Sequence, residues 1–238
     1  MSIISGYEAH RFSVVGREYQ TTTINKLKGD IELQVFTDCL GLDLYELMKT
    51  DSALIDLTSL LEWSAATTYA LSDKIFFYDS IMESKAANNL NHNPAHDAAG
   101  QYWNFADKFT DENFQELYEL YLRDILANKI IKECLIIDTM QVSAKGITMS
   151  VSPDQHGNAT ADVKTIEYQL RHIQSIIDRK IELMNVWLIA EYKKFVADNL
   201  TAYDWSIIPF VKSQCSDCLI GQGKGRTRIA FRRNRYDW

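Results

Sequence analysis

Two cysteines near the C-terminus have the spacing that most directly suggests chemistry. Cys215 and Cys218 form a CxxC pair, which occurs in zinc sites and in redox centres. A structural zinc ion needs four ligands, but the chain has no second such pair, and His156 and His172 have no ligand-like spacing to it. The βαβ context of a thioredoxin-type centre is also missing. We predict no metal and no cofactor; a metal-dependent enzyme would need metal bound at this pair.

A glycine-rich run and two neighbouring histidines are weaker candidates. Gly221–Arg226 resembles a phosphate-binding loop, but its lysine is followed by glycine, and no buried strand leads into a helix there. His92 and His96 are four residues apart, but Pro94 between them prevents a shared helical face, so we expect solvated loop residues. No serine or cysteine lies in a motif typical of a nucleophile. We predict that the protein is not an enzyme and has no catalytic residues.

The last residues of the chain combine arginine with aromatic side chains. Such a segment suits phosphate contact with base stacking, and it equally suits docking into an acidic or apolar groove of another protein. Thr227–Phe231 could also add a strand to the edge of a partner's sheet. We favour a protein partner, because the segment is short and the rest of the chain is acidic. The predicted partner-binding residues are Arg226, Arg228, Ile229, Phe231, Arg232, Arg233, Arg235, Tyr236 and Trp238.

Charge is unevenly distributed along the 238 residues. Residues 221–238 contain six basic residues and one acid, a formal charge of +5, which leaves 19 basic and 31 acidic residues, or −12, in residues 1–220. Such asymmetry is typical of a tail that docks elsewhere. The start resembles no signal peptide, and no apolar run approaches the ~20 residues of a membrane span. We therefore expect a soluble protein made in a cytoplasm, with reduced thiols and no membrane partner.

The first hundred residues predict mainly short helices. Residues 11–15 and 21–24 are interpreted as short strands or an extended arm, and helical turns follow up to Lys49, with a break or kink at Gly41. Thr50 or Asp51 is expected to cap a helix whose buried face includes Leu54, Leu57, Leu61 and Ala65. The run 71–85 is also predicted to be helical. Residues 88–100 are expected to form a polar, mobile loop.

The strongest pattern lies between residues 110 and 199. Thr110, followed by two acids, predicts the start of a first long helix that ends near Gly146. A β-hairpin is expected at about 147–161, and a second long helix follows from near Asp162. Apolar residues recur at helical spacing along that second helix. They are Ile166, Leu170, Ile173, Ile177, Ile181, Met184, Leu188, Tyr192 and Phe195.

Short motifs in residues 100–206 resemble head-to-tail connector proteins of tailed phages. The run Ala144–Met149 (AKGITM), a polar turn and a long helix starting near Asp162 are similar to the ring proteins of crAss-like phages that infect gut Bacteroidetes. In that family a Lys-Gly step ends one long helix, and aromatics on the return helix precede a closing Asp/Glu-Trp. Tyr192, Phe195 and Tyr203–Trp205 fit this pattern. The C-terminal segment with the CxxC pair departs from it.

This resemblance implies a helical adaptor assembled as a dodecameric ring beneath the portal protein of the virion. Its C-terminal arm would embrace or insert into portal subunits, and other tail or ring proteins would bind the remaining face. DNA would pass through the channel without sequence-specific binding, and an acidic wall would repel its phosphates.

We therefore predict a mainly α fold: an elongated helical bundle with two long antiparallel helices joined by a short β-hairpin, plus an extended C-terminal arm. Residues 1–206 would form the body and 207–238 the docking arm. Ile147, Met149, Val151 and His156 are predicted to lie at a subunit contact or to face the lumen or the next ring. The alternative function is a helical nucleic-acid-binding accessory protein that uses the basic-aromatic tail.

Overall fold

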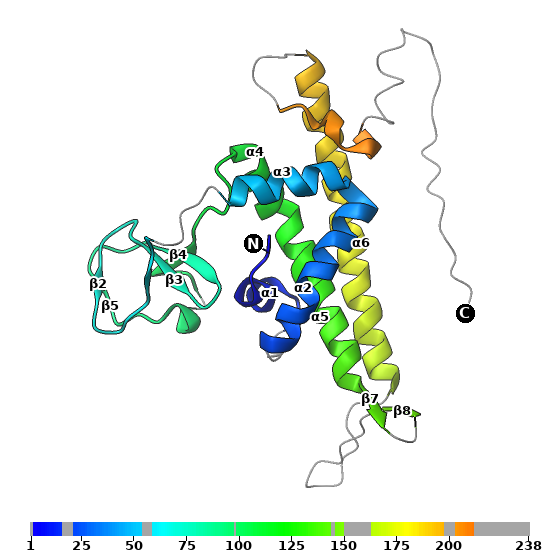
Figure 1. The fold of residues 1–238 in the computed structure, drawn as a ribbon, viewed down its shortest axis with the longest axis horizontal. Helices are drawn as coiled ribbons and strands as arrows, with labels where there is room; N and C mark the ends of the chain where they lie inside the picture. The colour runs from blue at the N-terminus through cyan, green and yellow to red at the C-terminus, as the bar shows by residue number, and fades with distance from the viewer. Residues whose placement is uncertain are drawn as a thin grey trace.

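A computed structural model describes residues 2–15, 21–53, 59–97, 99–143, 146–149, 163–197 and 203–211. This part of the chain forms a helical body, a small β unit at its side (residues 61–105) and a short β-hairpin at the end of the body (Figure 1). The helices of the body are α1 (Gly6–Phe12), α2 (Thr21–Val35), α3 (Leu42–Ser52), α4 (Glu112–Leu117), α5 (Arg123–Thr139) and α6 (Val163–Ala197). Two π-helical turns, η1 (Phe36–Leu40) and η3 (Tyr118–Leu122), and a 3₁₀ turn, η4 (Trp205–Ile207), complete it.

The predicted fold class was wrong, because the chain between α3 and α4 builds β-sheet. A four-stranded mixed sheet has the order β1 (Leu61–Glu62), β3 (Lys74–Phe77), β4 (Ser80–Ser84) and β6 (Trp103–Phe105), with β1 parallel to β3 and the other pairs antiparallel. A second, two-stranded sheet is formed by β2 (Thr68–Tyr69) and β5 (Asn89–Leu90), which are antiparallel. A 3₁₀ turn, η2 (Pro94–His96), precedes β6. The molecule is therefore not an elongated bundle with one short hairpin.

The predicted helix over 71–85 is a β-hairpin. Ile75, Tyr78 and Met82 are three and four residues apart, which is helical spacing, but Ile75 and Phe77 also alternate with less buried neighbours, which is strand spacing. Phe77 pairs with Ser80, so only two residues form the turn. Five side chains close a small core between the strands, and these aromatic and apolar residues favour sheet. They are Tyr69, Ile75, Phe77, Met82 and Trp103.

The short strands or extended arm predicted near the N-terminus are mostly helix. Residues 11 and 12 end α1, residues 13–15 follow it as bends, and residues 21–24 form the first turn of α2. Ser5 and Glu8 make a capping box at the start of α1, in which each side chain binds the backbone N–H of the other. This motif is visible in the sequence and outweighs the β-branched residues nearby. Gly41, the expected break, separates η1 from α3 at a φ of +93° that favours glycine.

The predicted cap at Thr50 or Asp51 was also wrong. Asp51 lies in the last turn of α3, and its carboxylate accepts hydrogen bonds from the backbone N–H groups of Thr110 (2.7 Å) and Asp111 (3.2 Å). Asp111 in turn caps α4 by accepting from the N–H of Asn113 at 2.8 Å. Asp51 therefore joins the end of α3 to the entry into the long helical segment instead of starting a helix.

The long helices α5 and α6 lie side by side (Figure 1). The predicted buried face of α6 is confirmed at five of its positions: Ile173, Ile177, Met184, Leu188 and Tyr192. These side chains pack into one apolar core with residues of α2, α3 and α5. Helix α6 has 35 residues, which gives a length of roughly 52 Å at about 1.5 Å per residue.

A β-hairpin does lie beyond the end of α5, but earlier in the chain than predicted. Helix α5 ends at Thr139, not near Gly146, and β7 (Met140–Ser143) pairs with β8 (Gly146–Met149). The partner of β8 is therefore the segment before it, not residues 159–161. Pairing across two residues closes a shorter loop than pairing across the predicted turn, so it costs less chain entropy. Ile147 and Met149 lie on β8, while Val151 and His156 lie outside the described residues.

The β unit is joined to α1 through the turn between β3 and β4. Asp79 accepts hydrogen bonds from the N–H groups of Gly6 (2.5 Å) and Tyr7 (3.2 Å), and its carboxylate pairs with Lys28 at 3.3 Å. A negative charge at a helix N-terminus is favourable. Burial raises the pKa of Asp79, but these hydrogen bonds and the lysine charge outweigh it, so the pKa lies below its ordinary 3.8.

Asp79→Ala is expected to destabilise the fold by about 1–3 kcal/mol, because it removes charge-assisted hydrogen bonds between the two parts. Since the folded pKa lies below the unfolded one, this contribution is complete above the ordinary pKa of aspartate. It is lost as the pH falls through the folded pKa. Urea unfolding at neutral and acidic pH measures both effects. Asp30→Ala, at an exposed position on α2, is the matched control; an equal loss in both variants would refute the role of Asp79.

Candidate assembly interface

The buried side of α6 fixes which of its residues face solvent. Trp187 packs against Tyr121 of η3 and Trp205 of η4, with ring centroids 5.7 Å apart in both pairs. Across the helix pair, Lys180 binds Asp124 at 2.6 Å. These contacts on the α5 side prevent α6 from rotating about its own axis. The opposite side of α6 therefore faces solvent in a defined orientation.

Large apolar side chains lie on that opposite side. Tyr168 is 72% exposed, Leu183 47% and Val186 62%. Residues 183 and 186 are one turn apart, and residue 168 is five turns before 186, so all three share one side of the helix. Tyr168 also stacks on His172, at 6.4 Å between ring centroids. Leu183 and Val186 are adjacent on this side, and we call this pair the apolar strip. Tyr168 lies about 22 Å away along the helix at about 1.5 Å per residue, with the exposed Arg171, Arg179 and Glu182 between them on the same side. Single exposed apolar residues are ordinary, whereas an adjacent pair on a rigid helix suits a protein contact.

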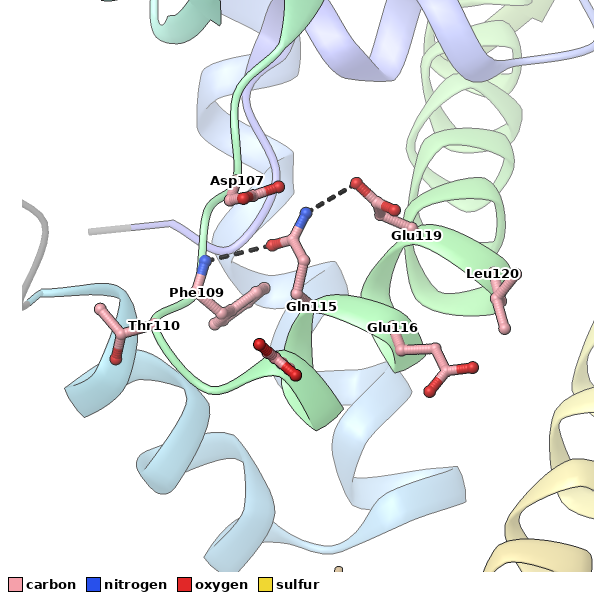
Figure 2. Close-up of a pocket in the computed structure, with 8 residues that line it drawn as sticks. Asp107, Phe109, Thr110, Gln115, Glu116, Glu119 and Leu120 are labelled. Carbon is pink, nitrogen blue, oxygen red and sulfur yellow. Dashed lines mark hydrogen bonds between the residues drawn. The ribbon is translucent and has the colours of Figure 1, made fainter.

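A pocket of about 410 Å³ lies where the chain enters α4 and η3 (Figure 2). Gln115 lies at its centre: its amide oxygen accepts from the backbone N–H of Phe109 at 3.2 Å, and its NH₂ group donates to Glu119 at 2.7 Å. Figure 2 shows Leu120 and Glu116 on the helical side of the pocket, away from Thr110. The charged lining residues are all acids: Asp107, Glu112, Glu116 and Glu119.

The acidic pocket is lined by charges of one sign. Its four carboxylate residues are exposed, and the described lining contains no basic residue to neutralise them. A concave surface with charges of one sign repels anions and attracts cations. Nucleic-acid phosphates would therefore be repelled here, whereas lysine or arginine side chains of a protein partner would be attracted.

A buried polar cluster supports this region from inside. Glu8 of α1 is 2% exposed and Lys108 is 8% exposed, and their charged groups form an ion pair. The hydroxyl of Tyr118 donates to the Glu8 carboxylate at 2.8 Å and lies 3.4 Å from the Lys108 ammonium. Burial raises the pKa of Tyr118 well above its ordinary value, and the Glu8 charge raises it further, so the hydroxyl keeps its proton.

Sequence reasoning did not find this cluster. Glu8 lies 100 positions before Lys108 and 110 before Tyr118, and none of the three belongs to a motif with a known ligand or reaction. Lys108 also links the cluster to the acidic pocket, because its backbone N–H donates to Gln115 at 2.9 Å. The cluster positions α1 against η3 and the pocket wall; its side chains are buried and closed to solvent.

The structure places few of the residues singled out from the sequence. The arm residues 226–238 and the pair Cys215 and Cys218 lie outside the described residues. His92 and His96, expected to be solvated loop residues, both line one pocket on the β unit. Within the described ranges, no group of three or more His, Cys, Asp or Glu is arranged to hold a metal ion.

Comparisons with models of known families, with curated proteins and with solved structures find no match for this chain. None of the described helices is both long enough and apolar enough to cross a membrane.

Proposed function

We propose that this protein is a structural virion protein that forms the head-to-tail connector ring of a tailed phage. The observation that carries the proposal is the apolar strip on α6, held in a fixed orientation by the packing of α6 against α5. The resemblance of residues 100–206 to connector proteins supplies the identity of the assembly. Portal subunits, neighbouring copies and other tail proteins are the proposed partners.

A closed ring makes specific demands on each subunit. Neighbours related by rotation meet through two different surfaces, and those surfaces must stay rigid for the ring to close. A helix pair with a continuous core meets the second demand, because its exposed side cannot rotate without breaking that core. In the proposed ring, the strip of one copy is covered by another surface of the next copy.

The acidic pocket fits the same proposal. A channel wall through which DNA passes must not bind phosphates, and exposed carboxylates repel them. In the proposed assembly the predicted arm docks on the portal and DNA is not bound through base contacts. Binding of DNA that weakens steeply with added salt would instead support the nucleic-acid accessory protein.

The proposal is tested by the mass of the purified protein in solution. The subunit mass is 27.4 kDa, and sedimentation equilibrium gives the number of subunits directly. We expect the protein to self-associate into one discrete species of high subunit number. The fraction of the protein in this species should rise with protein concentration. Binding of duplex DNA by a species that stays monomeric would favour the accessory protein instead.

Charges placed in the strip are expected to prevent assembly. Leu183→Glu combined with Val186→Glu should weaken self-association by at least about a hundredfold, because two buried apolar contacts become buried unpaired charges. The melting temperature of the subunit should change little, since both side chains are exposed in the single chain. Sedimentation velocity measures the loss.

A matched control adds the same two charges elsewhere. Asn25→Glu combined with Gln34→Glu changes exposed positions on α2, away from the strip, and should leave assembly as in the natural sequence. If the strip variant assembles as well as this control does, the strip is not the subunit contact.

A further inference from the structure

A second surface pocket lies on the β unit, apart from α6 and the acidic pocket. Its volume is about 650 Å³, within the range of small-molecule sites. Trp63 and Tyr102 contribute aromatic rings, and Asn91, Asn93 and Gln101 contribute side-chain amides. Such a combination of rings and neutral hydrogen-bonding groups differs chemically from both surfaces described above.

The aromatic wall of this pocket is rigidly held. The imidazole of His92 stacks on Tyr102 with centroids 3.5 Å apart and ring planes at 9°. The backbone carbonyl of His92 accepts from the indole N–H of Trp103 at 2.6 Å, which fixes the histidine to the core of the β unit. Trp63 packs edge-on against Phe77 at 6.2 Å. The rings therefore keep their positions without a ligand.

The neighbouring side chains select the tautomer of His92. The Asn89 NH₂ group donates to Ser84 and to the backbone carbonyl of Tyr102, both at 3.1 Å, so its amide oxygen faces His92 Nδ1 at 2.9 Å. An amide oxygen accepts hydrogen bonds, so Nδ1 carries the proton of the neutral ring. Nε2 then remains as an acceptor with no partner among the residues that the structure describes.

The carboxylate of Asp97 is already used by the loop. One oxygen accepts from the N–H of Gln101, and the other accepts from those of Tyr102 and Trp103, all at 2.8 Å. Burial raises the pKa of Asp97, but these three hydrogen bonds outweigh it and lower the pKa, so the charge is stabilised by the backbone. The charge shapes the loop and is not left free for a cation.

Several hydrogen-bonding groups that line this pocket have no partner in the described part of the chain. In the described part of the chain, the amides of Asn91 and Gln101 make no side-chain hydrogen bond, and Asn93 uses only its oxygen, to accept from the N–H of Ala95. Each free amide offers two donors, and each unused amide oxygen adds an acceptor. The described lining includes no lysine or arginine. The nearby Arg11 guanidinium donates to the backbone carbonyl of Asp97 at 2.7 Å, and its charge acts on the Asp97 carboxylate.

We propose that this pocket binds a neutral saccharide unit of a glycan. The C–H face of a sugar ring packs on Trp63 and on the stacked pair of His92 and Tyr102. Its hydroxyl groups, each both donor and acceptor, pair with the amides of Asn91 and Gln101 and with Nε2 of His92. Because hydroxyls carry no charge, the absence of a cationic side chain in the described lining costs nothing. This site goes beyond the connector proposal and does not depend on it.

The test uses the full-length chain on immobilised oligosaccharides. Neutral probes end in glucose, galactose, mannose or N-acetylglucosamine, and sialylated and sulfated oligosaccharides serve as anionic probes. We expect binding to at least one neutral probe. Asn91→Gly combined with Gln101→Ala should weaken it about tenfold through the lost hydrogen bonds. Glycine suits residue 91, whose φ is +58°, so the melting temperature should be unchanged.

Two further variants complete the test. Asn25→Ala combined with Gln34→Ala removes the same two amides from exposed positions on α2 and should bind as the natural chain does. Trp63→Ala should abolish binding; if it fails to fold, the Asn91 and Gln101 variant decides alone. The proposal is overturned if no neutral probe binds, if only anionic probes bind, or if the Asn91 and Gln101 variant binds as tightly as the control.

Discussion

Lys108→Met is expected to destabilise the protein by about 3–5 kcal/mol, because it leaves the carboxylate of Glu8 buried without its cation. The two groups form an ion pair in which each residue is nearly excluded from solvent. Methionine replaces most of the volume of lysine, so the loss reflects charge and not a cavity. Urea unfolding of the variant measures it.

A double variant separates the effect of the unpaired Glu8 charge from other effects of replacing Lys108. Glu8→Gln added to Lys108→Met removes the unpaired charge and should recover a large part of the stability, since a neutral amide still accepts from Tyr118. Lys26→Met makes the same lysine substitution at an exposed position of α2. If Lys108→Met costs no more than Lys26→Met, the buried cluster does not hold α1 against η3.

Trp205→Ala is expected to cost about 3–5 kcal/mol, the usual loss for a fully buried large aromatic. Trp205 is 1% exposed and lies between Tyr203, Trp187 and Phe114, with ring centroids 4.7, 5.7 and 6.5 Å away. These contacts hold residues 203–211 against α4 and α6. The substitution should therefore also expose that segment to proteases.

The conservative variant Trp205→Phe keeps part of the aromatic packing and should lose less than half as much stability. Chemical denaturation compares the two, and limited proteolysis followed by mass spectrometry locates the first cleavage site. A Trp205→Ala variant that keeps both its stability and the protease resistance of residues 203–211 would contradict this role.

The long helix α6 could be predicted because one local pattern determined it. Apolar residues repeat at helical spacing over many turns, so the assignment does not depend on what the helix packs against. Residues 71–85 lacked such redundancy: Ile75, Tyr78 and Met82 fit helical spacing as well as a short hairpin. Pairing with β1 and β6, which are distant in sequence, determined the outcome there.

The surfaces proposed for binding could be predicted only in part. The apolar face predicted for the second long helix leaves out Leu183 and Val186, so the spacing already placed both off the core, and the structure shows that they are exposed. Trp63 and Tyr102 are separated by most of the β unit, and only its folding brings both to one pocket with His92. In contrast, the capping box of Ser5 and Glu8 was present in the sequence and could have placed α1.

Imaging of the purified protein by negative-stain electron microscopy tests the central proposal most directly. We expect closed rings of about a dozen subunits with a central channel, and no rings in the variant Leu183→Glu with Val186→Glu. Particles no larger than the 27.4 kDa subunit at every concentration, for the natural sequence as for the variant, would contradict the connector proposal.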